Sequence, residues 1–348
     1  MKILVTGGAG FIGSAVIRNA IKKGHSVINV DCLNYAACLK NLAEVEGHRN
    51  YFFEKVNIRN KKKVSLIFEK YKPDRVMHLA AESHVDRSID GPEDFIKTNI
   101  IGTYNLLQAS YEHWVSIKSK NFLFHHISTD EVFGSLPNKK SIKFKEDTPY
   151  DPRSPYSASK ASSDHLVRAW NKTYGLPFVL TNCSNNYGPF HFPEKLIPLV
   201  IINALLGKNI PIYGDGSNIR DWLYVEDHAS ALLKVLSEGI VGSSYNIGGN
   251  NECTNLDLVN MICKILDKVQ PKISGSYSDL IEFVEDRPGH DIRYSIDATK
   301  IKNELGWSPS VNLEEGLKKT IMWYIDNKSW WKPLLKRKSV GTRLGKKI

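Results

Sequence analysis

Short apolar runs alternate with segments of helical period along the first half of the chain. These runs lack the polar alternation of a half-exposed strand, and each is followed by a segment suited to a helix. Such a pattern is typical of a parallel sheet that helices cover on both faces. We therefore predict a doubly wound α/β fold with strands at Lys2–Thr6, Ser26–Asp31, Tyr51–Val56, Arg75–Ala80 and Phe122–Ser128.

The regular alternation fades after about Cys183, where proline and glycine interrupt the chain repeatedly. This change predicts a second, smaller lobe that binds a substrate. Strand-like runs at Asp221–Val225 and Ser244–Ile247 are expected to return to the main sheet, so the two lobes interleave in sequence. We expect a first domain from 1–182 plus about 220–250, a smaller lobe from 183–219 and 251–330, and a tail at 331–348.

The composition is that of a globular protein, because 42% of the 348 residues are hydrophobic and 24% are charged. No apolar run reaches the roughly 18 residues of a membrane span. The first six residues have the pattern of a strand rather than of a signal peptide. Five scattered cysteines without a C-x-x-C pair indicate neither disulfides nor a zinc site. We expect a soluble cytoplasmic protein without a metal ion or a membrane partner.

The formal net charge of +10 favours a nucleic-acid partner until its distribution is considered. Seven basic residues and no acidic one follow Trp331, so seven of the ten excess positive charges lie in the last 17 residues. The preceding residues are nearly neutral. A basic end is usually a solvated tail, so we expect no nucleic-acid partner. An anionic partner for the tail is the alternative.

A glycine-rich segment directly follows the first predicted strand and precedes a helical pattern. Glycines at this place let the backbone approach a pyrophosphate, and the free N–H groups of the helix start attract its charge. Two spacings fit, Gly8-x-Gly10-x-x-Gly13 and Gly7-x-x-Gly10-x-x-Gly13, and the second is the form of short-chain dehydrogenases. The context predicts a Rossmann-like dinucleotide site, and a glycine-rich turn without a ligand is the alternative.

Asp31 closes the second predicted strand. A carboxylate there accepts hydrogen bonds from an adenosine ribose and repels a 2′-phosphate. No arginine follows directly to receive such a phosphate. The acid therefore predicts NAD rather than NADP as the cofactor, and a surface aspartate without a ligand is the alternative.

Tyr156 and Lys160 are four residues apart in a segment of helical period, so they share one face of a helix. A free tyrosine has a pKa of about 10 and is a poor base at neutral pH. A nearby ammonium group and a nicotinamide cation favour its phenolate. The pair predicts a base for an alcohol that is being oxidised. Tyr-x-x-x-Lys alone is a weak signal, and its weight comes from the preceding glycine loop and strands.

Asp130 and Glu131 follow the fifth predicted strand at its carboxyl end, where open α/β sheets place reactive groups. In a dry site, two adjacent carboxyl groups can differ enough for one to stay protonated as an acid and the other ionised as a base. A simple alcohol dehydrogenase has no use for this pair. Two acids in a solvated loop are the alternative.

Together these motifs resemble the extended short-chain dehydrogenase/reductase superfamily, and the match narrows to the dTDP-glucose 4,6-dehydratase family. Asp130-Glu131 discriminates most, because the related epimerases and decarboxylases carry other residues there. The resemblance covers nearly the whole chain. Its carriers are Thr6–Gly13, Ala80–Ser88, Ser128–Gly134, Tyr156–Ala161, Asn182–Pro189, Phe192–Pro198, Asn218–His228 and Asp286–Tyr294.

The resemblance implies dehydration of a nucleoside-diphosphate hexose, by family default dTDP-glucose, to its 4-keto-6-deoxy form. Tyr156, tuned by Lys160 and assisted by Thr129, removes the C4 hydroxyl proton while the C4 hydride passes to NAD⁺. Glu131 then takes the C5 proton as Asp130 protonates the departing C6 hydroxyl. Hydride returns from NADH to C6 and a proton returns to C5, so NAD is regenerated, and the product suits deoxysugar synthesis.

The resemblance also implies the binding residues and a homodimer through Pro92–His113 and Pro155–Tyr174. Arg220 and Arg287 suit the diphosphate, because a planar guanidinium binds phosphate oxygens bidentately. The residues implied for NAD are Gly7, Gly10, Phe11, Ile12, Gly13, Asp31, Asn34, Asn57, Ile58, Ala80, Ala81, Ser83, Tyr156 and Lys160. Those implied for the nucleotide sugar are His84, Thr129, Asn185, Glu194, Lys195, Leu196, Arg220, Arg287, His290 and Tyr294.

The chain departs from the family pattern at three places outside the catalytic set. Asn57 stands where an aspartate is usual, Ala37-Cys38 replaces Gly-Asn, and Phe133 replaces a tyrosine. A sister epimerase or decarboxylase, which would not eliminate water, is the nearest alternative, and Asp130-Glu131 argues against it. A non-catalytic NAD-binding module is another alternative. Such modules commonly lack the tyrosine or the lysine, whereas this chain has both Tyr156 and Lys160. The sequence leaves the nucleobase open, with thymidine as the family default and uridine as the alternative.

Overall fold

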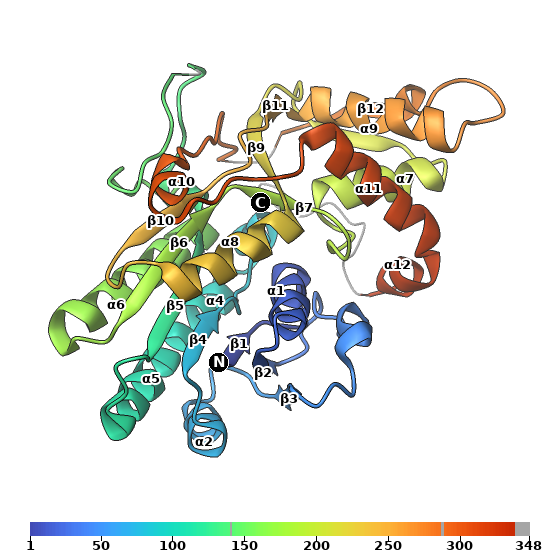
Figure 1. Ribbon diagram of the computed structural model, residues 1–348. Coiled ribbons are helices and arrows are strands. Elements are labelled where there is room, and N and C mark those ends of the chain that lie inside the picture. The colour runs from blue at the N-terminus through green and yellow to red at the C-terminus, as the bar shows by residue number, and fades with distance from the viewer. Residues whose placement is uncertain (140, 287–288, 338–348) are drawn as a thin grey trace.

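The computed structural model describes residues 1–139, 141–286 and 289–337. Within these residues, seven parallel strands form the central sheet, which confirms the predicted doubly wound α/β fold (Figure 1). In spatial order they are β10 (Ser244–Ile247), β6 (Phe178–Cys183), β5 (Leu123–Thr129), β4 (Arg75–His78), β1 (Lys2–Thr6), β2 (Ser26–Asp31) and β3 (Tyr51–Lys55). The order changes direction between β1 and β4, and open α/β sheets bind ligands at that point.

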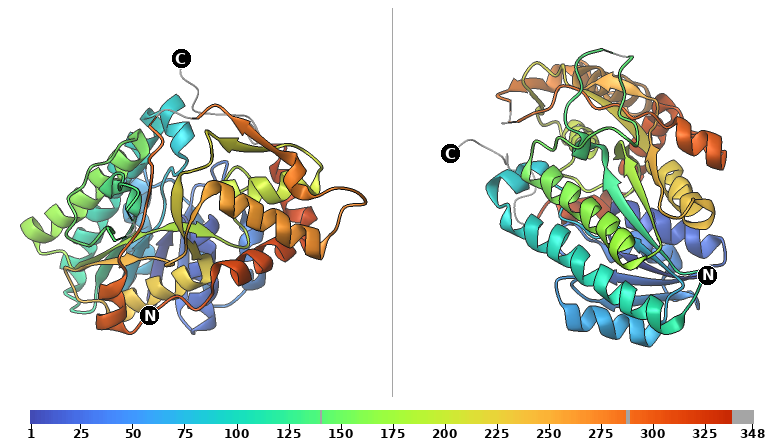
Figure 2. Two further views of the ribbon diagram at one scale, coloured as in Figure 1. Left: turned by 90° about the horizontal axis from the view of Figure 1, so that it is seen from above. Right: turned by 90° about the vertical axis from the view of Figure 1, so that its left-hand side faces the viewer.

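Helices cover both faces of this sheet (Figure 2). Ile3 and Val5 of β1 point into one core and Leu4 points into the other, and all three are at most 1% exposed. Burial on both faces explains why the strand has no polar alternation. The first core includes α1 (Phe11–Lys22), α8 (Val225–Glu238) and α10 (Thr299–Leu305), and the second includes α2 (Lys61–Tyr71), α5 (Thr103–Ile117) and α6 (Pro155–Tyr174).

Short helical segments follow the strands at the edge where the cavity lies. They connect the strands to the longer helices and carry several of the predicted site residues. They are η1 (Leu39–Val45), α3 (Val85–Asp90), α4 (Glu93–Phe95), η2 (Ile96–Gly102) and η3 (Asp130–Phe133).

A smaller lobe with its own core lies beyond the carboxyl ends of the main strands, at the upper right of Figure 1. Its strand β9 (Ile219–Tyr224) lies between β7 (Asn185–Tyr187) and β11 (Glu252–Thr254), and β8 (Ile210–Tyr213) pairs with β12 (Ile281–Val284). Its helices are α7 (Leu196–Leu205), α9 (Asn255–Val269), η4 (Tyr277–Leu280), α11 (Leu313–Asp326) and α12 (Lys328–Leu334).

The expectation that Asp221–Val225 returns to the main sheet is wrong. This run lies almost entirely in β9, whose partners β7 and β11 belong to the smaller lobe. The place beside β5 is taken by β6, which the sequence prediction omitted, while Ser244–Ile247 is confirmed as β10. An apolar run without alternation fits either sheet, because tertiary contacts rather than its own pattern select its partner.

The chain end packs further than a solvated tail would. Trp331 and Leu334, within the predicted tail, belong to α12 and are 1% and 3% exposed. Residues 338–348 of that tail lie outside the described residues. Among the described residues, no helix has the length and apolar character to cross a membrane.

Candidate active site

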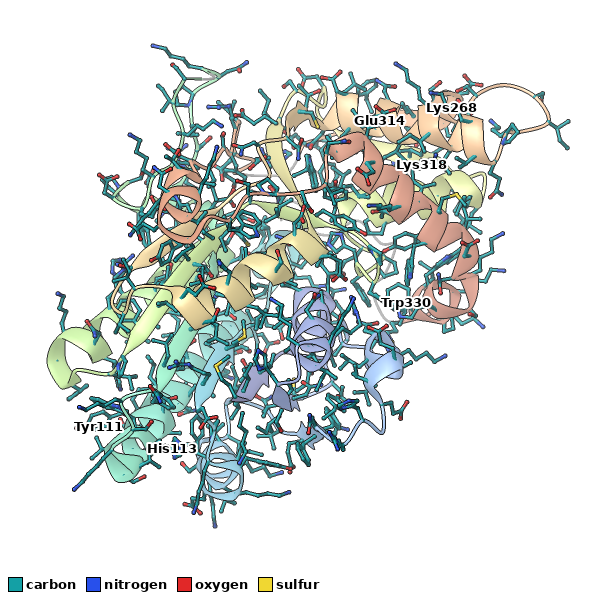
Figure 3. The ribbon with its side chains drawn as sticks, viewed as in Figure 1. Tyr111, His113, Lys268, Glu314, Lys318 and Trp330 are labelled. Atoms are coloured by element: carbon teal, nitrogen blue, oxygen red, sulfur yellow. The ribbon has the colours of Figure 1, made fainter. Side chains whose placement is uncertain are left out.

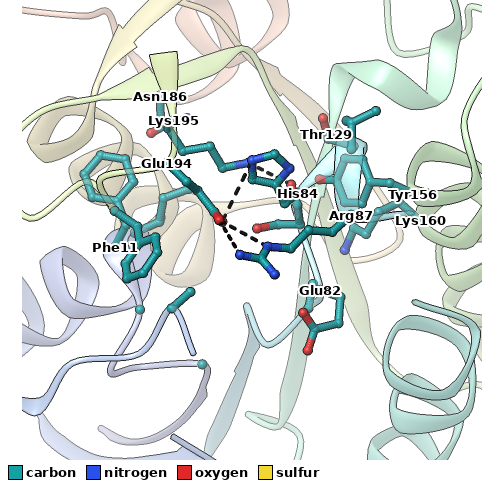
Figure 4. A pocket seen from close by; sticks show the side chains of 18 of the residues that line it. Phe11, Glu82, His84, Arg87, Thr129, Tyr156, Lys160, Asn186, Glu194 and Lys195 are labelled. Carbon is teal, nitrogen blue, oxygen red and sulfur yellow. Dashed lines mark hydrogen bonds and ion pairs between the residues drawn. The ribbon is translucent and has the colours of Figure 1, made fainter. Parts of the chain in front are cut away.

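A cavity of about 1060 Å³ lies between the carboxyl ends of the main strands and the smaller lobe (Figure 4). Every predicted catalytic and NAD-binding residue lines it. Arg287 lies outside the described residues, and Tyr294 lies behind the cavity wall. The predicted substrate residues that line the cavity are His84, Thr129, Asn185, Glu194, Lys195, Leu196, Arg220 and His290.

The glycine loop between β1 and α1 presents Gly7, Gly10 and Gly13 to the cavity. Gly7 has a φ of +73°, a conformation that favours glycine. A Cβ atom at Gly13 would lie 2.2 Å from the Gly7 carbonyl oxygen, so the close approach of helix and loop requires glycine there. Gly8 instead packs toward Asn29 and Ile17. The spacing that faces the cavity is therefore Gly7-x-x-Gly10-x-x-Gly13.

Asp31 lines the cavity at the end of β2 and is 7% exposed. Its Oδ2 accepts a hydrogen bond from the Ala9 N–H at 3.0 Å, and its Oδ1 accepts one from the Leu33 N–H at 2.8 Å. Burial raises the pKa of this carboxyl group, and the two backbone donors oppose that shift. The carboxylate thus ties the glycine loop to the segment after β2.

Helix α6 carries Tyr156 and Lys160 and begins with a capping box. The Ser154 hydroxyl accepts a hydrogen bond from the Ser157 N–H at 3.0 Å, and the Ser157 hydroxyl accepts one from the Ser154 N–H at 3.0 Å. Pro155 fits the first turn, where no backbone donor is needed. This start fixes Tyr156 in the first turn of the helix and Lys160 one turn later, both on the cavity wall (Figure 4).

Burial shifts both groups of the pair toward their neutral forms. The pKa of Tyr156 lies well above its usual value, because burial and the negative charge of Glu131 oppose the phenolate. A hydrogen bond with Thr129 acts in the opposite direction. Lys160 donates from Nζ to the Ile127 carbonyl at 2.9 Å, and burial lowers its pKa. Further positive charge in the cavity would therefore favour the Tyr156 phenolate.

Asp130 and Glu131 lie in η3, directly after β5. The Thr129 hydroxyl caps η3 by accepting from the Glu131 N–H at 3.3 Å. Asp130 is 1% exposed, and its Oδ2 has no hydrogen-bond partner among the described residues. Burial, and then the charges of Glu131 and Asp221, raise the pKa of Asp130 well above 3.8. Asp130 is therefore suited to hold a proton, whereas the half-buried Glu131 is suited to accept one.

A cluster that the sequence interpretation missed joins the two lobes across the cavity. The Arg87 Nη2 atom lies 2.8 Å from Glu194 Oε2, and the Tyr35 hydroxyl donates to Glu194 Oε1 at 2.8 Å. The Arg87 guanidinium lies 3.9 Å from the centroid of the Tyr35 ring, a cation–π arrangement. Arg87 lies within the segment Ala80–Ser88, so its position in that motif was an available signal. Tyr35 gave none.

Arg220 lies on the cavity wall, and residues outside the cavity lining hold its guanidinium group in place. Its Nη2 donates to the Asp291 carbonyl at 2.9 Å, and its guanidinium lies 4.3 Å from the Tyr294 ring centroid. Tyr294 is 3% exposed and donates its hydroxyl hydrogen bond to the Asp291 carboxylate. The structure thus places Tyr294 against Arg220 rather than in the cavity lining. Other lining residues that sequence reasoning missed include Glu82, Cys183, Asn186, His191 and Tyr213.

A Rossmann-like sheet, a glycine loop at the start of α1, and a Tyr-x-x-x-Lys pair on the same cavity define the class of this protein. It is an enzyme of the short-chain dehydrogenase/reductase type. The model of the family described as GDP-mannose 4,6 dehydratase matches residues 4–320, and the chain belongs to this family.

Relatives with names support this assignment over the whole chain. The chain is 56% identical over 359 residues to a dTDP-glucose 4,6-dehydratase of Escherichia coli, with 99% of each chain covered. The Bacillus anthracis dTDP-glucose 4,6-dehydratase in complex with NAD has a TM-score of 0.85 and 45% identity, over 96% of this chain and 99% of that one. The Streptomyces venezuelae enzyme with NAD bound has a TM-score of 0.88 and 42% identity, over 96% and 100%. The resemblance inferred from sequence is confirmed.

Proposed function

We propose that this chain is an NAD-dependent dTDP-glucose 4,6-dehydratase, which removes water from the sugar and leaves NAD regenerated. The observation that carries the proposal is the buried Asp130 next to Glu131, on the cavity that Tyr156 and the glycine loop also line. The curated relatives bear this name, and two similar solved structures hold NAD. The product suits deoxysugar biosynthesis.

The described residues fit NAD. Gly10 lines the cavity, and the N–H groups at the start of α1 can receive a diphosphate. Asp31 stands where the adenosine ribose would lie, and Asn57 lines the same region. When bound, the cofactor accepts a hydride from C4 of the sugar and returns it to C6. The positive charge of its oxidised ring also favours the phenolate of Tyr156.

The first chemical task of the protein is to take the C4 hydroxyl proton. Tyr156 performs it as phenolate, and the Thr129 hydroxyl lies near enough to hydrogen-bond with the phenol. Lys160 adds positive charge within the same wall and donates to the Ile127 carbonyl. The proton leaves the sugar as its C4–H bond breaks, so the C4 carbon becomes a ketone.

The second task is elimination across C5 and C6. The C4 ketone acidifies the C5–H bond, and Glu131 takes that proton as the carboxylate. Asp130, kept protonated by burial, gives its proton to the C6 hydroxyl, which departs as water. The two acids are adjacent in η3 but differ in exposure, and this difference supports the opposite roles.

The substrate is held on the side of the cavity that the smaller lobe forms. Arg220 is suited to bind the diphosphate, because its guanidinium group lies on the wall of this cavity. His84, Asn185 and Lys195 line the same cavity as that arginine and the candidate catalytic residues. The predicted roles of Arg287 and of the other substrate residues remain part of this proposal.

Incubation of the purified protein with dTDP-glucose, and separately with UDP-glucose, tests the function. We expect the nucleotide sugar to lose one water, about 18 Da, without net accumulation of NADH. Whether the dTDP sugar or the UDP sugar is turned over identifies the nucleobase that the protein accepts. An unchanged mass with both sugars, or a stereoisomer of unchanged mass, would contradict the dehydratase and leave an epimerase on the same scaffold.

The dimer and the compartment are also proposals. Exposed apolar side chains, including Ile96, Ile101, Tyr104 and Tyr174, lie on the face formed by η2, α5 and α6. Burial of this face against a second copy supports a homodimer through Pro92–His113 and Pro155–Tyr174. None of the five cysteines forms a disulfide, which supports a reducing cytoplasm.

A further inference from the structure

Helix α12 belongs to the smaller lobe but also contacts the first lobe, near the residues proposed to bind NAD. Trp331 and Leu334 lie in the core of the smaller lobe. Trp330, the residue before, donates from its indole Nε1 to Asn41 Oδ1 at 2.9 Å. Asn41 is part of η1, and Figure 3 shows Trp330 where α12 faces that segment. The indole of Trp330 therefore makes a contact between the two lobes.

Asn41 extends the contact to the glycine loop. Its Nδ2 donates to the Ala9 carbonyl at 3.1 Å, and the Cys38 N–H donates to the same carbonyl at 2.9 Å. The Ala9 N–H donates in turn to Asp31 Oδ2 at 3.0 Å. Asn41 is 2% exposed, so water does not compete for these bonds. A short path of hydrogen bonds thus joins Trp330 to the loop and the acid that line the NAD side of the cavity.

Arg337 makes a second contact with the same region. Its Nη1 donates to the Tyr35 carbonyl at 2.5 Å and to the Ala37 carbonyl at 2.9 Å. The segment between β2 and η1 has no regular structure, and Leu33 within it has a φ of +57°. Backbone of this kind depends on bonds from outside to hold one conformation. Asn34, on the same segment, lines the cavity.

Apolar packing is one of the contacts between this segment and α12, because Tyr35, Ala36 and Cys38 pack against the core that contains Trp330. A second cavity of about 580 Å³ lies between them, bounded by Leu33, Cys38, Lys40, Trp330 and Pro333 among others. At this cavity the apolar contact is incomplete, so directed hydrogen bonds add to the packing in fixing the segment. The hydrogen bonds of the indole and the guanidinium act on it together with those from Tyr35 to Glu194 and from Asn34 to Glu82.

We propose that Trp330 and Arg337 are positioning residues for NAD. They hold the segment from residue 32 to residue 41, and through Asn41 the glycine loop, in the conformation that binds the dinucleotide. This role rests on the proposed function, because it requires the NAD site described above. It also makes Arg337, which lies within the predicted tail, part of the structure that supports the cofactor site.

Trp330→Phe tests the path because it keeps an aromatic ring at this position and removes the indole N–H donor. On full-length protein stripped of cofactor, calorimetric titration with NAD⁺ should give an affinity about fivefold weaker than wild type, the effect of one hydrogen bond. Titration with dTDP should be unchanged. At saturating NAD⁺, kcat should also be unchanged. Arg337→Met should act in the same direction on NAD⁺ alone.

The neighbouring tryptophan provides a matched control. Trp331 donates from Nε1 to the Tyr324 carbonyl at 2.8 Å, inside the smaller lobe and away from the cofactor segment. Trp331→Phe therefore loses a bond of the same kind next to the tested position. It should lower the thermal midpoint but leave the affinity for NAD⁺ at the wild-type value.

A double variant tests the relay itself. In an Asn41→Ala background, Trp330→Phe should weaken NAD⁺ binding no further, because the relay is already broken. An unchanged NAD⁺ affinity in Trp330→Phe, or equal losses in Trp330→Phe and Trp331→Phe, would overturn the proposal. Failure of the wild-type protein to bind NAD⁺ would instead refute the proposed function, so the two failures are distinct.

Discussion

Asp130 and Glu131 are neighbours in sequence with different surroundings. The Asp130 side chain is enclosed and shares its pocket with negative charge from Glu131 and Asp221, so its proton is retained. Glu131 keeps contact with the cavity and with solvent. An elimination across C5 and C6 needs one acid that holds its proton and one group that accepts a proton, and the raised pKa of Asp130 suits the first role.

Asp130→Asn tests the acid role at this residue. The amide keeps the shape but cannot donate a proton to the leaving hydroxyl, so we expect elimination to slow by about 10²–10⁴-fold. Oxidation at C4 should persist, because Tyr156 and Lys160 are untouched. Rapid-mixing absorbance of NADH should therefore show accumulation that the wild type lacks. Elimination at the wild-type rate would remove Asp130 from the mechanism.

The same substitution should change stability with pH in a defined direction. The folded-state pKa of Asp130 is raised above 3.8. The wild type is thus favoured at low pH and loses stability as pH rises through the folded-state value. Asparagine cannot ionise, so Asp130→Asn should melt above the wild type at pH 8. The expected shift is about 2–4 °C for each kcal/mol of unfolding free energy that the substitution restores. This advantage should shrink as pH falls toward 4.

Asp164 provides the opposite case for the same melting experiment. It is fully buried, and burial alone would raise its pKa, but contacts with His126, Lys160 and Ser128 lower it below the usual value. Its charged form is therefore the stable one in the folded chain. Asp164→Asn should melt below the wild type at pH 8. If both variants shifted the same way, the distinction between the two buried acids would be wrong.

At the scale of elements, the start of α6 decides where Tyr156, the proposed catalytic tyrosine, lies. Ser154→Ala removes the cap and should cost about 1 kcal/mol, or roughly 2–4 °C in the melting temperature. Because Tyr156 is in the first turn, kcat should also fall, and Ser154→Thr should restore both. Ser162→Ala is the control, since the Ser162 hydroxyl bonds an exposed carbonyl within the same helix. An equal effect of both alanine variants would contradict the role of the cap.

The elements that sequence predicted well are those whose pattern is complete by itself. β1 and β2 begin and end where predicted, because each is an apolar run flanked by clear breaks. β4 ends two residues before the predicted Ala80, a difference typical of strand ends. The run at Asp221–Val225 was predicted as a strand but assigned to the wrong sheet, because strand pairing is decided by the tertiary fold.

The candidate site was predicted unevenly for the same reason. The glycine loop, Asp31 and the Tyr156 pair are local motifs whose spacing carries their chemistry. The bridge from Arg87 to Glu194 joins residues 107 positions apart, and no local pattern announces it. Tyr35 and the path from Trp330 to Asn41 depend in the same way on how the lobes pack. The division into domains at 182, 219 and 250 stays a prediction.

For the whole molecule, the cavity between the lobes requires that both keep their relative position. Contacts that hold it include the Arg87–Glu194 bridge and the Trp330–Asn41 bond. The proposed catalytic groups come from the first lobe and the candidate diphosphate arginine from the second. The site is therefore complete only when these contacts are made.

The proposed dimer is the remaining feature at this scale. Ile101 is 48% exposed on the face of η2 and α5, where a second copy would bury it. Ile101→Arg places a charge in that apolar contact, and a buried unpaired charge is costly. We expect light scattering after gel filtration to give a dimer for the wild type and mainly monomer for the variant. The fold should persist, because the side chain is exposed within one copy.

Ile240→Arg distinguishes loss of the interface from a general effect of added charge. Ile240 is 56% exposed and directly follows α8, on the other face of the main sheet. This variant should remain dimeric. If the wild type were monomeric at micromolar concentration, or if both variants stayed dimeric, the α5–α6 face would not be the interface. Turnover by monomeric Ile101→Arg would then show whether each copy carries a complete site, as the cavity lining within one chain implies.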